Sequence, residues 1–425
     1  MRTRQQAHDR VPASAMFYAV TVALLVGVVV SAWVLFAHLR NQRAEAFLNA
    51  ARTADNARSA AIMALAVLPN EGGSVQMTLH GEREDSVQVE RIPFGALDLI
   101  VSHAHRHGHH VRMFGYGAGG LNAKGPVLQM PDRQGAVHLS GDARLAGDVV
   151  VPNGDVRRGH IEGRTYTGEQ LVEGAVIPAQ GGLPPLATGL PERLRALCNG
   201  ASLGQLRGLE QQGDGRTHAQ YQVPTMEFTG PTSLAGMTFM GPCVIRCTDT
   251  LTIATDSQLD MVVLQAPYIK MEDGFTGAVQ CFARRGMLIG EDCRLKYPSL
   301  LAVVRDGHDA AAPKLHLGAR TYVQGGVAFV DQQGRGRATG GVIIEADARI
   351  EGELFVAGDL QLHGEVRGSV ITDQLLVRTP TATYEGHLLD GVIAGFPYDE
   401  PWCIGLTNGQ APRTIVAWRK FPSEG

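Results

Sequence analysis

Charged and aromatic side chains are scarce in this 425-residue sequence. Charged residues make up 19% of it and aromatic residues 6%, and the formal net charge is −4. No extended run of Lys or Arg occurs, so electrostatics gives no reason to expect a nucleic-acid partner. The sequence also lacks the Gly-Lys-[Ser/Thr] phosphate loop and the His-Glu-x-x-His zinc motif. We therefore expect no nucleic-acid partner, no cofactor and no enzymatic activity.

Cysteine is present without a clear metal-binding spacing. The six cysteines are an even number, which permits disulfides in an exported domain. Cys243 and Cys247 are separated by three residues, and no second Cys pair or His pair with zinc spacing accompanies them. We therefore expect these cysteines to be structural.

One uncharged stretch near the N-terminus is long enough to cross a membrane. No charged residue occurs from position 11 to 37, and a helix needs about 20 apolar residues to span a bilayer. Phe17 and Trp33 suit the two membrane interfaces. We predict a tail over 1–15 and a transmembrane helix over 16–39. The alternative, a cleaved signal peptide, would have a shorter apolar core followed by a small-residue cleavage site.

The flanking arginines do not decide the orientation of this helix. The basic residues on its two sides balance, so the positive-inside rule gives a tie: Arg2, Arg4, Arg10, Arg40, Arg43 and Arg52. We expect the tail to be cytoplasmic and the large domain periplasmic. The chain would then be a single-pass protein of the inner membrane.

An Ala-rich helical stem is predicted over 40–70. The segment is free of Gly and Pro until Pro69, and apolar residues recur at roughly helical spacing: Phe47, Ala51, Ala54, Ala61 and Leu65. One helix from Met16 to Leu68 would be about 80 Å long.

This N-terminus resembles the stem of a pilin or pseudopilin. The shared features are a short basic leader, an apolar helix and an amphipathic extension. Pilins carry Gly before the cleavage point and Glu five residues into the mature helix. Here Ala15 precedes Met16, and the first Glu is Glu45.

A nine-residue pattern occurs five times after the stem. Two apolar residues two apart share one face of a strand, and a third follows a small polar turn. With 52 glycines in the chain, such stacked strand–turn–strand units indicate a solenoid. The copies start at Val137, Leu251, Met287, Leu315 and Val342. We predict a mainly β protein: a parallel β-helix, or β-solenoid, after one long transmembrane and stem α-helix.

The solenoid is expected in two segments. We predict an N-terminal β module with the first coils over 71–180, in which 94–101 could be helical. A linker or insertion follows over 181–225, with a helix within 191–209. The main β-solenoid covers 226–393, and an aromatic C-terminal cap covers 394–425 and includes Trp402 and Trp418.

The C-terminal β region resembles the bactofilins, which are polymer-forming β-solenoids. The likeness lies in the rhythm of 342–354 and 362–370. The whole layout also resembles single-pass bacterial envelope proteins. The resemblance implies a structural role with self-association or envelope-protein partners.

A histidine cluster is the sharpest chemical feature: His103, His105, His107, His109 and His110. Imidazoles at this density bind Zn, Ni or Cu, and they gain charge below about pH 6.5. On a single strand the four odd-numbered residues would share one face. A metal site, a pH sensor and a solvated loop are the three interpretations.

Acidic residues of the β region have two interpretations. Asp142, Asp256, Asp292 and Asp347 lie at the turn of the repeat, where Asp hydrogen-bonds to nearby backbone amides, so we favour turn formation over calcium binding. A glycan-cleaving β-helix would need paired carboxylates on one face. Its candidates are Asp260, Lys270, Glu272, Asp273, Arg284, Arg285 and Lys296.

The sequence therefore predicts a membrane-anchored scaffold built on a β-solenoid, which binds envelope partners or copies of itself. A pseudopilin-like component of a secretion or pilus system is the first alternative. A glycan-binding or glycan-cleaving β-helix is the second.

Overall fold

The computed structural model describes most of the chain. The described residues are 13–68, 72–79, 85–120, 125–133, 135–201, 223–305, 313–331, 340–396, 403–407 and 411–420. The fold class predicted from the sequence, mainly β with parallel strands after one long N-terminal helix, is confirmed.

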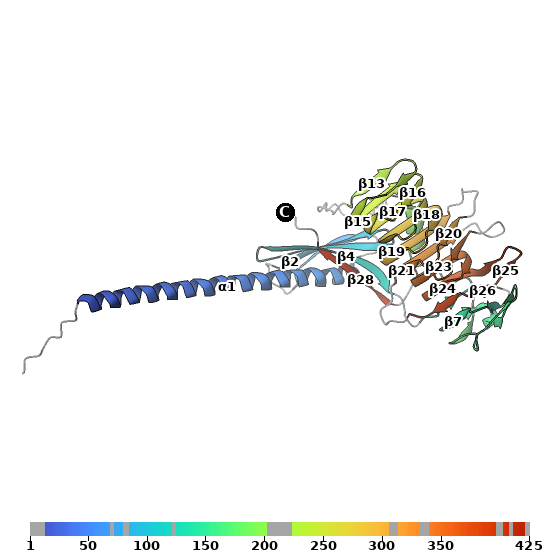
Figure 1. Cartoon of the computed structure of the whole chain (residues 1–425), viewed down its shortest axis with the longest axis horizontal. Helices are drawn as coiled ribbons and strands as arrows, with labels where there is room; N and C mark the ends of the chain where they lie inside the picture. Colours follow the sequence, from blue (N-terminus) through green and yellow to red (C-terminus); the bar gives the residue numbers. More distant parts are fainter. Residues whose placement is uncertain are drawn as a thin grey trace, which may run out of the picture.

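Helix α1 (Ala13–Val67) is one continuous rod of 55 residues that projects from a β-rich head (Figure 1). It contains no proline, and Pro69 follows its end, which explains where it stops. Its last turns pack on a sheet through four alanines, which allow a close approach of the helix, and one leucine: Ala57, Ala60, Ala61, Ala64 and Leu65.

The buried stripe of α1 differs from the predicted one. Phe47 is 74% exposed and Ala51 is also exposed, whereas Thr53 and Asn56 are buried. Ala54, Ala61 and Leu65 do pack on the sheet, so the predicted spacing holds over the packed turns and fails towards the N-terminal half of the helix. Only the residues that face the sheet are covered, and Phe47 lies beyond the part of α1 that contacts it.

A five-stranded antiparallel sheet holds the end of α1. Its strand order is β1-β2-β3-β4-β28. The apolar segment over 94–101 is not helical; it forms the β2–β3 hairpin, in which Gly95 adopts a left-handed φ of 64°. The bounds are β1 Gly73–Met77, β2 Ser86–Phe94, β3 Leu97–Arg106, β4 His109–Gly120 and β28 Ala411–Lys420.

The two faces of this sheet pack against different partners. Side chains alternate between faces along a strand. Ile100 and Met113 belong to the cluster formed with α1. Leu99 and Tyr116 belong to a second cluster formed with the outer surface of the β-solenoid. The sheet is therefore the middle layer between the helix and the solenoid.

The long strands of the main solenoid stack in parallel and bend from one face of a coil to the next. β17 pairs with β18, β18 with β19, β19 with β21, β21 with β23, and β23 with β24. The bounds are β13 Thr225–Phe228, β14 Thr232–Ser233, β15 Thr238–Cys247, β16 Thr250–Ile253, β17 Gln258–Met271, β18 Thr276–Ile289, β19 Arg294–Arg305, β20 Lys314–Leu317, β21 Tyr322–Asp331, β22 Gly341–Ile344, β23 Arg349–Leu362 and β24 Glu365–Arg378.

The first coils in the sequence stack on the last coil of the main solenoid. β5 pairs with β24, β6 with β26, and β7 with β27, all in parallel. The order of coils along the axis therefore differs from the order in the sequence. The bounds are β5 Leu128–Gln129, β6 Val137–Ser140, β7 Arg144–Ala146, β8 Val149–Val151, η1 Pro152–Gly154, β9 Val156–Arg158, β10 His160–Ile161, β11 Arg164–Thr165, β12 Val176–Pro178, β25 Thr383–Glu385, β26 His387–Leu389 and β27 Val392–Ala394.

The segment predicted as a linker connects the two ends of this stack. After β12 at one end, the chain passes through α2 (Leu190–Cys198) and reaches β13 at the other end. Leu194 and Leu197 of α2 are fully buried against the outer surface of the solenoid. The part over 202–222 lies outside the described residues.

The nine-residue pattern forms a strand, a turn and the next strand in each copy. Asp292, Arg320 and Asp347 occupy the same turn position with left-handed φ values of 54°, 58° and 60°. All the inward apolar positions of the five copies are buried in one core: Val137, Leu139, Leu145, Leu251, Ile253, Leu259, Met287, Ile289, Leu295, Leu315, Leu317, Val323, Val342, Ile344 and Ile350.

The C-terminal segment does not cap the solenoid over its described residues. β28 instead pairs with β4 and completes the antiparallel sheet, and Trp418 packs against the α1–sheet cluster. The backbone groups along the edge of β4 find partners there, which explains the placement. Trp402 lies outside the described residues. The solenoid is thus an insertion between two neighbouring strands of one sheet.

Candidate functional site

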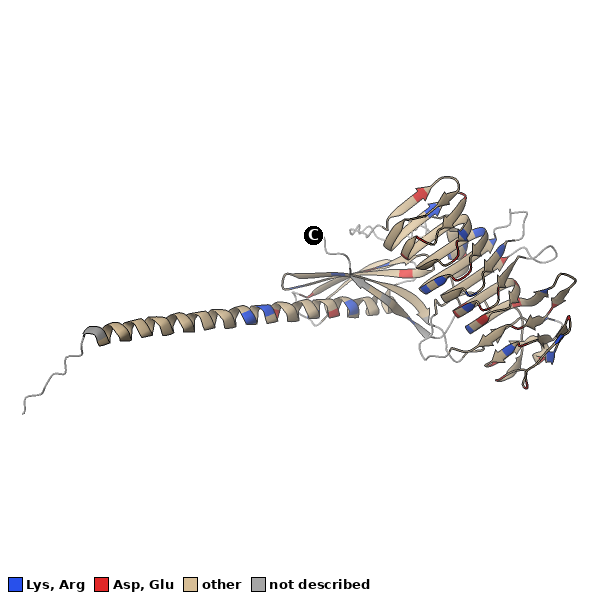
Figure 2. Cartoon of the chain, in the orientation of Figure 1, with Lys and Arg blue, Asp and Glu red and all other residues tan. Residues whose placement is uncertain are grey.

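The exposed half of α1 is the first candidate functional surface. Its most apolar 18-residue window has a mean hydropathy of 2.6, and none of that window is buried. Figure 2 shows Lys and Arg only on the half of α1 nearer the head. The helix is long and apolar enough to cross a membrane, in agreement with the predicted anchor.

A buried carboxylate fixes α1 to the head. The Asp98 carboxylate accepts hydrogen bonds from Arg91 (Nε–Oδ2 3.1 Å), Arg193 (3.3 Å) and Arg413. Arg91 also donates to the carbonyl oxygen of Leu68, just after α1, at 2.7 Å. Asp98 therefore joins the end of α1, the β2–β3 hairpin, α2 and β28.

A second buried carboxylate joins the solenoid to the returning chain. Glu353, on β23, accepts backbone N–H groups of Ile404 at 2.9 Å, Gly405 at 2.7 Å and Leu406 at 3.0 Å. Burial raises the pKa of Glu353, and these donors oppose that rise. The loop held here leads directly to β28, so the solenoid and the sheet are tied at this point.

A buried amide makes a third connection. The Gln280 side chain, on β18, accepts the N–H of Ala96 at 2.8 Å and donates to the carbonyl oxygen of Phe94 at 3.2 Å. It satisfies backbone groups of the β2–β3 turn. The sheet and the solenoid therefore form one connected head, and the last turns of α1 are fixed to it.

The histidine cluster lies on a hairpin, not on a single strand. His103 and His105 are on β3, His109 and His110 are on β4, and His107 is in the turn with a φ of 44°. Because β4 runs back along β3, His110 joins the face of His103 and His105. His109 points to the other face, opposite Arg106. The four odd-numbered histidines would share one face only on a single strand; in the hairpin His109 lies on the opposite face from His103 and His105.

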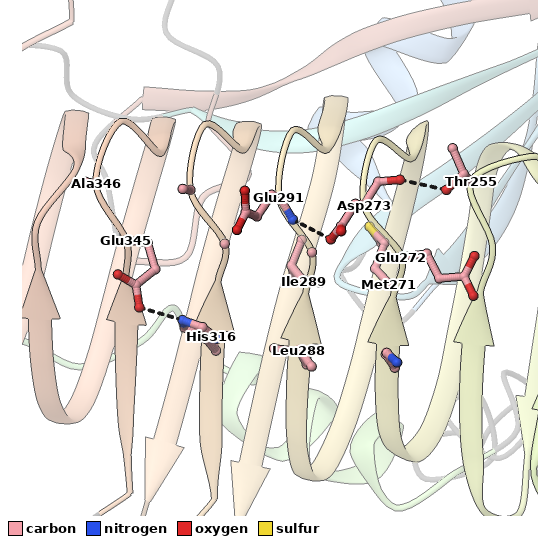
Figure 3. A pocket seen from close by; sticks show the side chains of 14 residues that line it. Thr255, Met271, Glu272, Asp273, Leu288, Ile289, Glu291, His316, Glu345 and Ala346 are labelled. Carbon is pink, nitrogen blue, oxygen red and sulfur yellow. Dashed lines mark hydrogen bonds and ion pairs between the residues drawn. The ribbon is translucent and has the colours of Figure 1, made fainter.

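A groove follows the stacked turns of the solenoid (Figure 3). Three of the glycan-site candidates line it: Lys270, Glu272 and Asp273. Asp273 Oδ1 accepts the backbone N–H of Glu291 at 2.9 Å, so this carboxylate stabilises a turn.

Two further groove carboxylates, those of Glu345 and Glu291, also have partners. The Glu345 carboxylate is 2.8 Å from Nε2 of His316, and Glu291 is 2.6 Å from the Arg320 guanidinium. The described residues that line the groove include no Phe, Trp or Tyr.

The turn aspartates have structural partners as well. Asp256 accepts the N–H of Gly236 at 2.9 Å, and Asp292 pairs with Arg320 at 2.8 Å. In the described part of the chain, no group of three His, Cys, Asp or Glu residues is already arranged to hold a metal ion. Both contacts link neighbouring coils, and the left-handed φ of Asp292 and Asp347 fits the turn-forming interpretation of the recurrent Asp.

All six cysteines are buried free thiols. Burial raises the pKa of Cys198 to about 12 and that of Cys243 to about 11. The thiols therefore act as small apolar packing groups, and they do not have the low pKa of a nucleophilic cysteine.

Asp98, Glu353 and Gln280 were not found from the sequence. Their partners lie far along the chain, with 315 positions between Asp98 and Arg413 and 184 between Ala96 and Gln280. No local spacing marks such residues. An isolated polar residue within an apolar strand was the only available signal.

Comparison with known proteins does not identify a family for this chain. No family model and no curated protein matches the chain. One solved structure that resembles it is the competence-associated pilin ComZ from Thermus thermophilus, at 10% identity over 91% of this chain and 95% of that chain, with a TM-score of 0.18. A TM-score this low does not define a shared fold, and none of these comparisons supports the bactofilin resemblance.

Proposed function

We propose that the chain is a pilin-like subunit. Helix α1 anchors it in the inner membrane, with the head in the periplasm, and its apolar half packs against the helices of other subunits in an assembly. The head then displays the β-solenoid on the outside of that assembly.

The main support for this proposal is that one half of α1 is fixed to the head, whereas its apolar half packs against no other part of the described chain. The fixed half is packed by Ala57 to Leu65 and held through Leu68 and Asp98. In the apolar half, Leu24 is 66% exposed and Val26 is 56% exposed. Apolar helix surface of this extent must be covered by lipid or by other helices.

The departure from the pilin leader pattern bears on maturation. Ala15 stands where pilins have Gly, and the apolar helix lacks an early Glu. We infer that the short basic tail is retained, and that α1 enters the assembly without a free amino terminus at Met16.

Cysteine crosslinking in native membranes tests the proposal. Val26→Cys places a thiol on the apolar half of α1, and Phe47→Cys places one on the same helix between that half and the head. The native cysteines are buried and do not compete. Oxidation should give disulfide-linked dimers at position 26 that persist when the protein is expressed at native level.

Two results would show that α1 is a simple monomeric anchor. One is the absence of crosslinks at both positions. The other is a crosslink at position 26 that disappears when the protein is diluted in the membrane. Phe47→Cys reports how far the helix contact extends towards the head. Val26 lies within the predicted membrane span and Phe47 lies outside it, so a membrane-permeant oxidant is needed for both variants.

A second candidate function is end-to-end stacking of the solenoid. At one end β12 pairs with β8, and no strand is paired to its other edge among the described residues. Val176 and Ile177 on β12 are 40% and 41% exposed, and Met240 on β15 is 69% exposed. Unpaired edges with exposed apolar residues favour association. A head fragment that forms filaments would support this alternative.

A further inference from the structure

Three imidazoles gather on one face of the β3–β4 hairpin. His103 and His105 are two apart on β3, so their side chains share a face. His110 on β4 is directly opposite His105. The ring centroids of His105 and His110 are 4.5 Å apart, and those of His103 and His110 are 5.9 Å apart.

These rings are accessible. His103 and His110 are exposed and His105 is half-buried. The face that packs against α1 carries the neighbouring residues Ala104 and Met113 instead. The three imidazoles can therefore change rotamer without disturbing the core.

The hairpin tip lies on the membrane side of the head. The β2–β3 turn, at the other end of β3, is the part that contacts Gln280 of the solenoid. Along α1, Ser102 bonds to the carbonyl oxygen of Ala57, whereas Arg91, paired with Ile100, reaches Leu68. Moving along β3 towards the tip thus moves along α1 towards the anchor.

We propose that His103, His105 and His110 form a binding site for a divalent first-row metal ion such as Zn²⁺. Three protein nitrogens leave the fourth tetrahedral position open for water or for a side chain of a partner. The site is independent of the proposed assembly function, because it rests on the hairpin and not on the apolar half of α1.

The ring spacing fits this ligand set. With Zn–N bonds of about 2.1 Å and tetrahedral angles, the centroids of two coordinating imidazoles lie about 5 Å apart. The spacings of 4.5 and 5.9 Å bracket that value. As the side chains stand, no group of three ligands among the described residues is arranged for a metal ion. Binding therefore requires His103 and His110, whose rings are exposed, to change rotamer.

Side chains of both neighbouring strands flank His103. Arg112 pairs with His103 across β4, and Gln88 pairs with it across β2. Burial, followed by His110, Arg112 and His105, lowers the pKa of His103. An imidazole must be neutral to bind a metal ion.

Isothermal titration with zinc chloride tests the proposal on the full chain in detergent, purified without a polyhistidine tag. We expect one ion per chain at pH 7.5. His105→Ala and His110→Ala should each weaken binding by at least about 100-fold, since each removes one of three ligands. His109→Ala is the matched control: it removes the same side chain from the same hairpin, one residue from His110, on the opposite face.

Substitution with Co²⁺ gives a second readout, because a tetrahedral site has intense visible absorption. Loss of this absorption in His103→Ala, with the control unchanged, would support the site. Equal weakening in His109→Ala and His110→Ala would show nonspecific chelation by surface histidines and overturn the proposal. Absence of saturable binding at pH 7.5 would also overturn it.

Discussion

Replacing Asp98 with Asn removes the carboxylate that joins four segments of the molecule. Asn has nearly the same shape but no charge, so Arg91, Arg193 and Arg413 lose their common partner. Removing one member of a buried ion pair typically costs about 3–5 kcal/mol. Arg91 is 1% exposed and cannot rehydrate, whereas Arg413 is 31% exposed and can. We therefore expect a loss of about 4 kcal/mol.

Urea unfolding followed by tryptophan fluorescence measures this loss on residues 41–425, which keep the packed half of α1. Hydrogen exchange should locate it: amides of β28 and of the last turns of α1 should exchange faster, while those of the inner solenoid strands stay protected. Asp373→Asn is the control. Asp373 pairs with Arg133 at 2.9 Å in an exposed position, so its loss should cost less than about 1 kcal/mol. The reasoning is refuted if the two variants unfold at the same urea concentration.

Three further outcomes follow from the structure. Glu353→Ala should leave three backbone N–H donors without their acceptor, two of them buried, and destabilise the head by about 3 kcal/mol. Amides over 403–407 should then exchange faster; unchanged exchange there would show that Glu353 does not hold this loop. Gly368→Ala should strongly destabilise the head, because Gly368 has a φ of +147° and a Cβ there would lie 1.9 Å from the Gly352 carbonyl oxygen. Gly182→Ala is the control, since a Cβ at that position meets nothing within 4 Å. Equal unfolding midpoints for the two variants would disprove this stacking contact. At pH 8 a thiol reagent should label no native cysteine of the folded head, since the pKa of Cys198 is raised to about 12; rapid labelling before unfolding would show that the thiols are accessible.

Local periodicity was sufficient to predict much of the fold. The apolar helix follows from an uncharged stretch without proline, and the solenoid follows from five copies of one strand–turn–strand pattern. Both signals lie within about 20 residues of sequence, so they can be read without knowing the tertiary contacts. The turn position of the repeat was also visible, because Asp, Arg and Gly recur there.

Long-range contacts account for what the sequence did not predict. The C-terminal strand looked like a solenoid cap because its tryptophans and prolines are irregular, yet β28 pairs with β4, about 300 positions earlier. The first coils stack on the last because β5 pairs with β24, which no local pattern encodes. For the histidine cluster, a single strand and a loop were both considered, whereas the structure has a hairpin turn at His107 and Gly108.

The most direct test of the proposed function compares the assembly state of two forms of the protein by sedimentation velocity. One form is the full chain in detergent, and the other is residues 41–425, which lack the apolar half of α1 but keep the half that packs on the sheet. The account predicts a defined oligomer for the full chain and a concentration-independent monomer for the shorter form. Filaments or large oligomers of the shorter form would contradict it, because they would place self-assembly in the head and not in the helix.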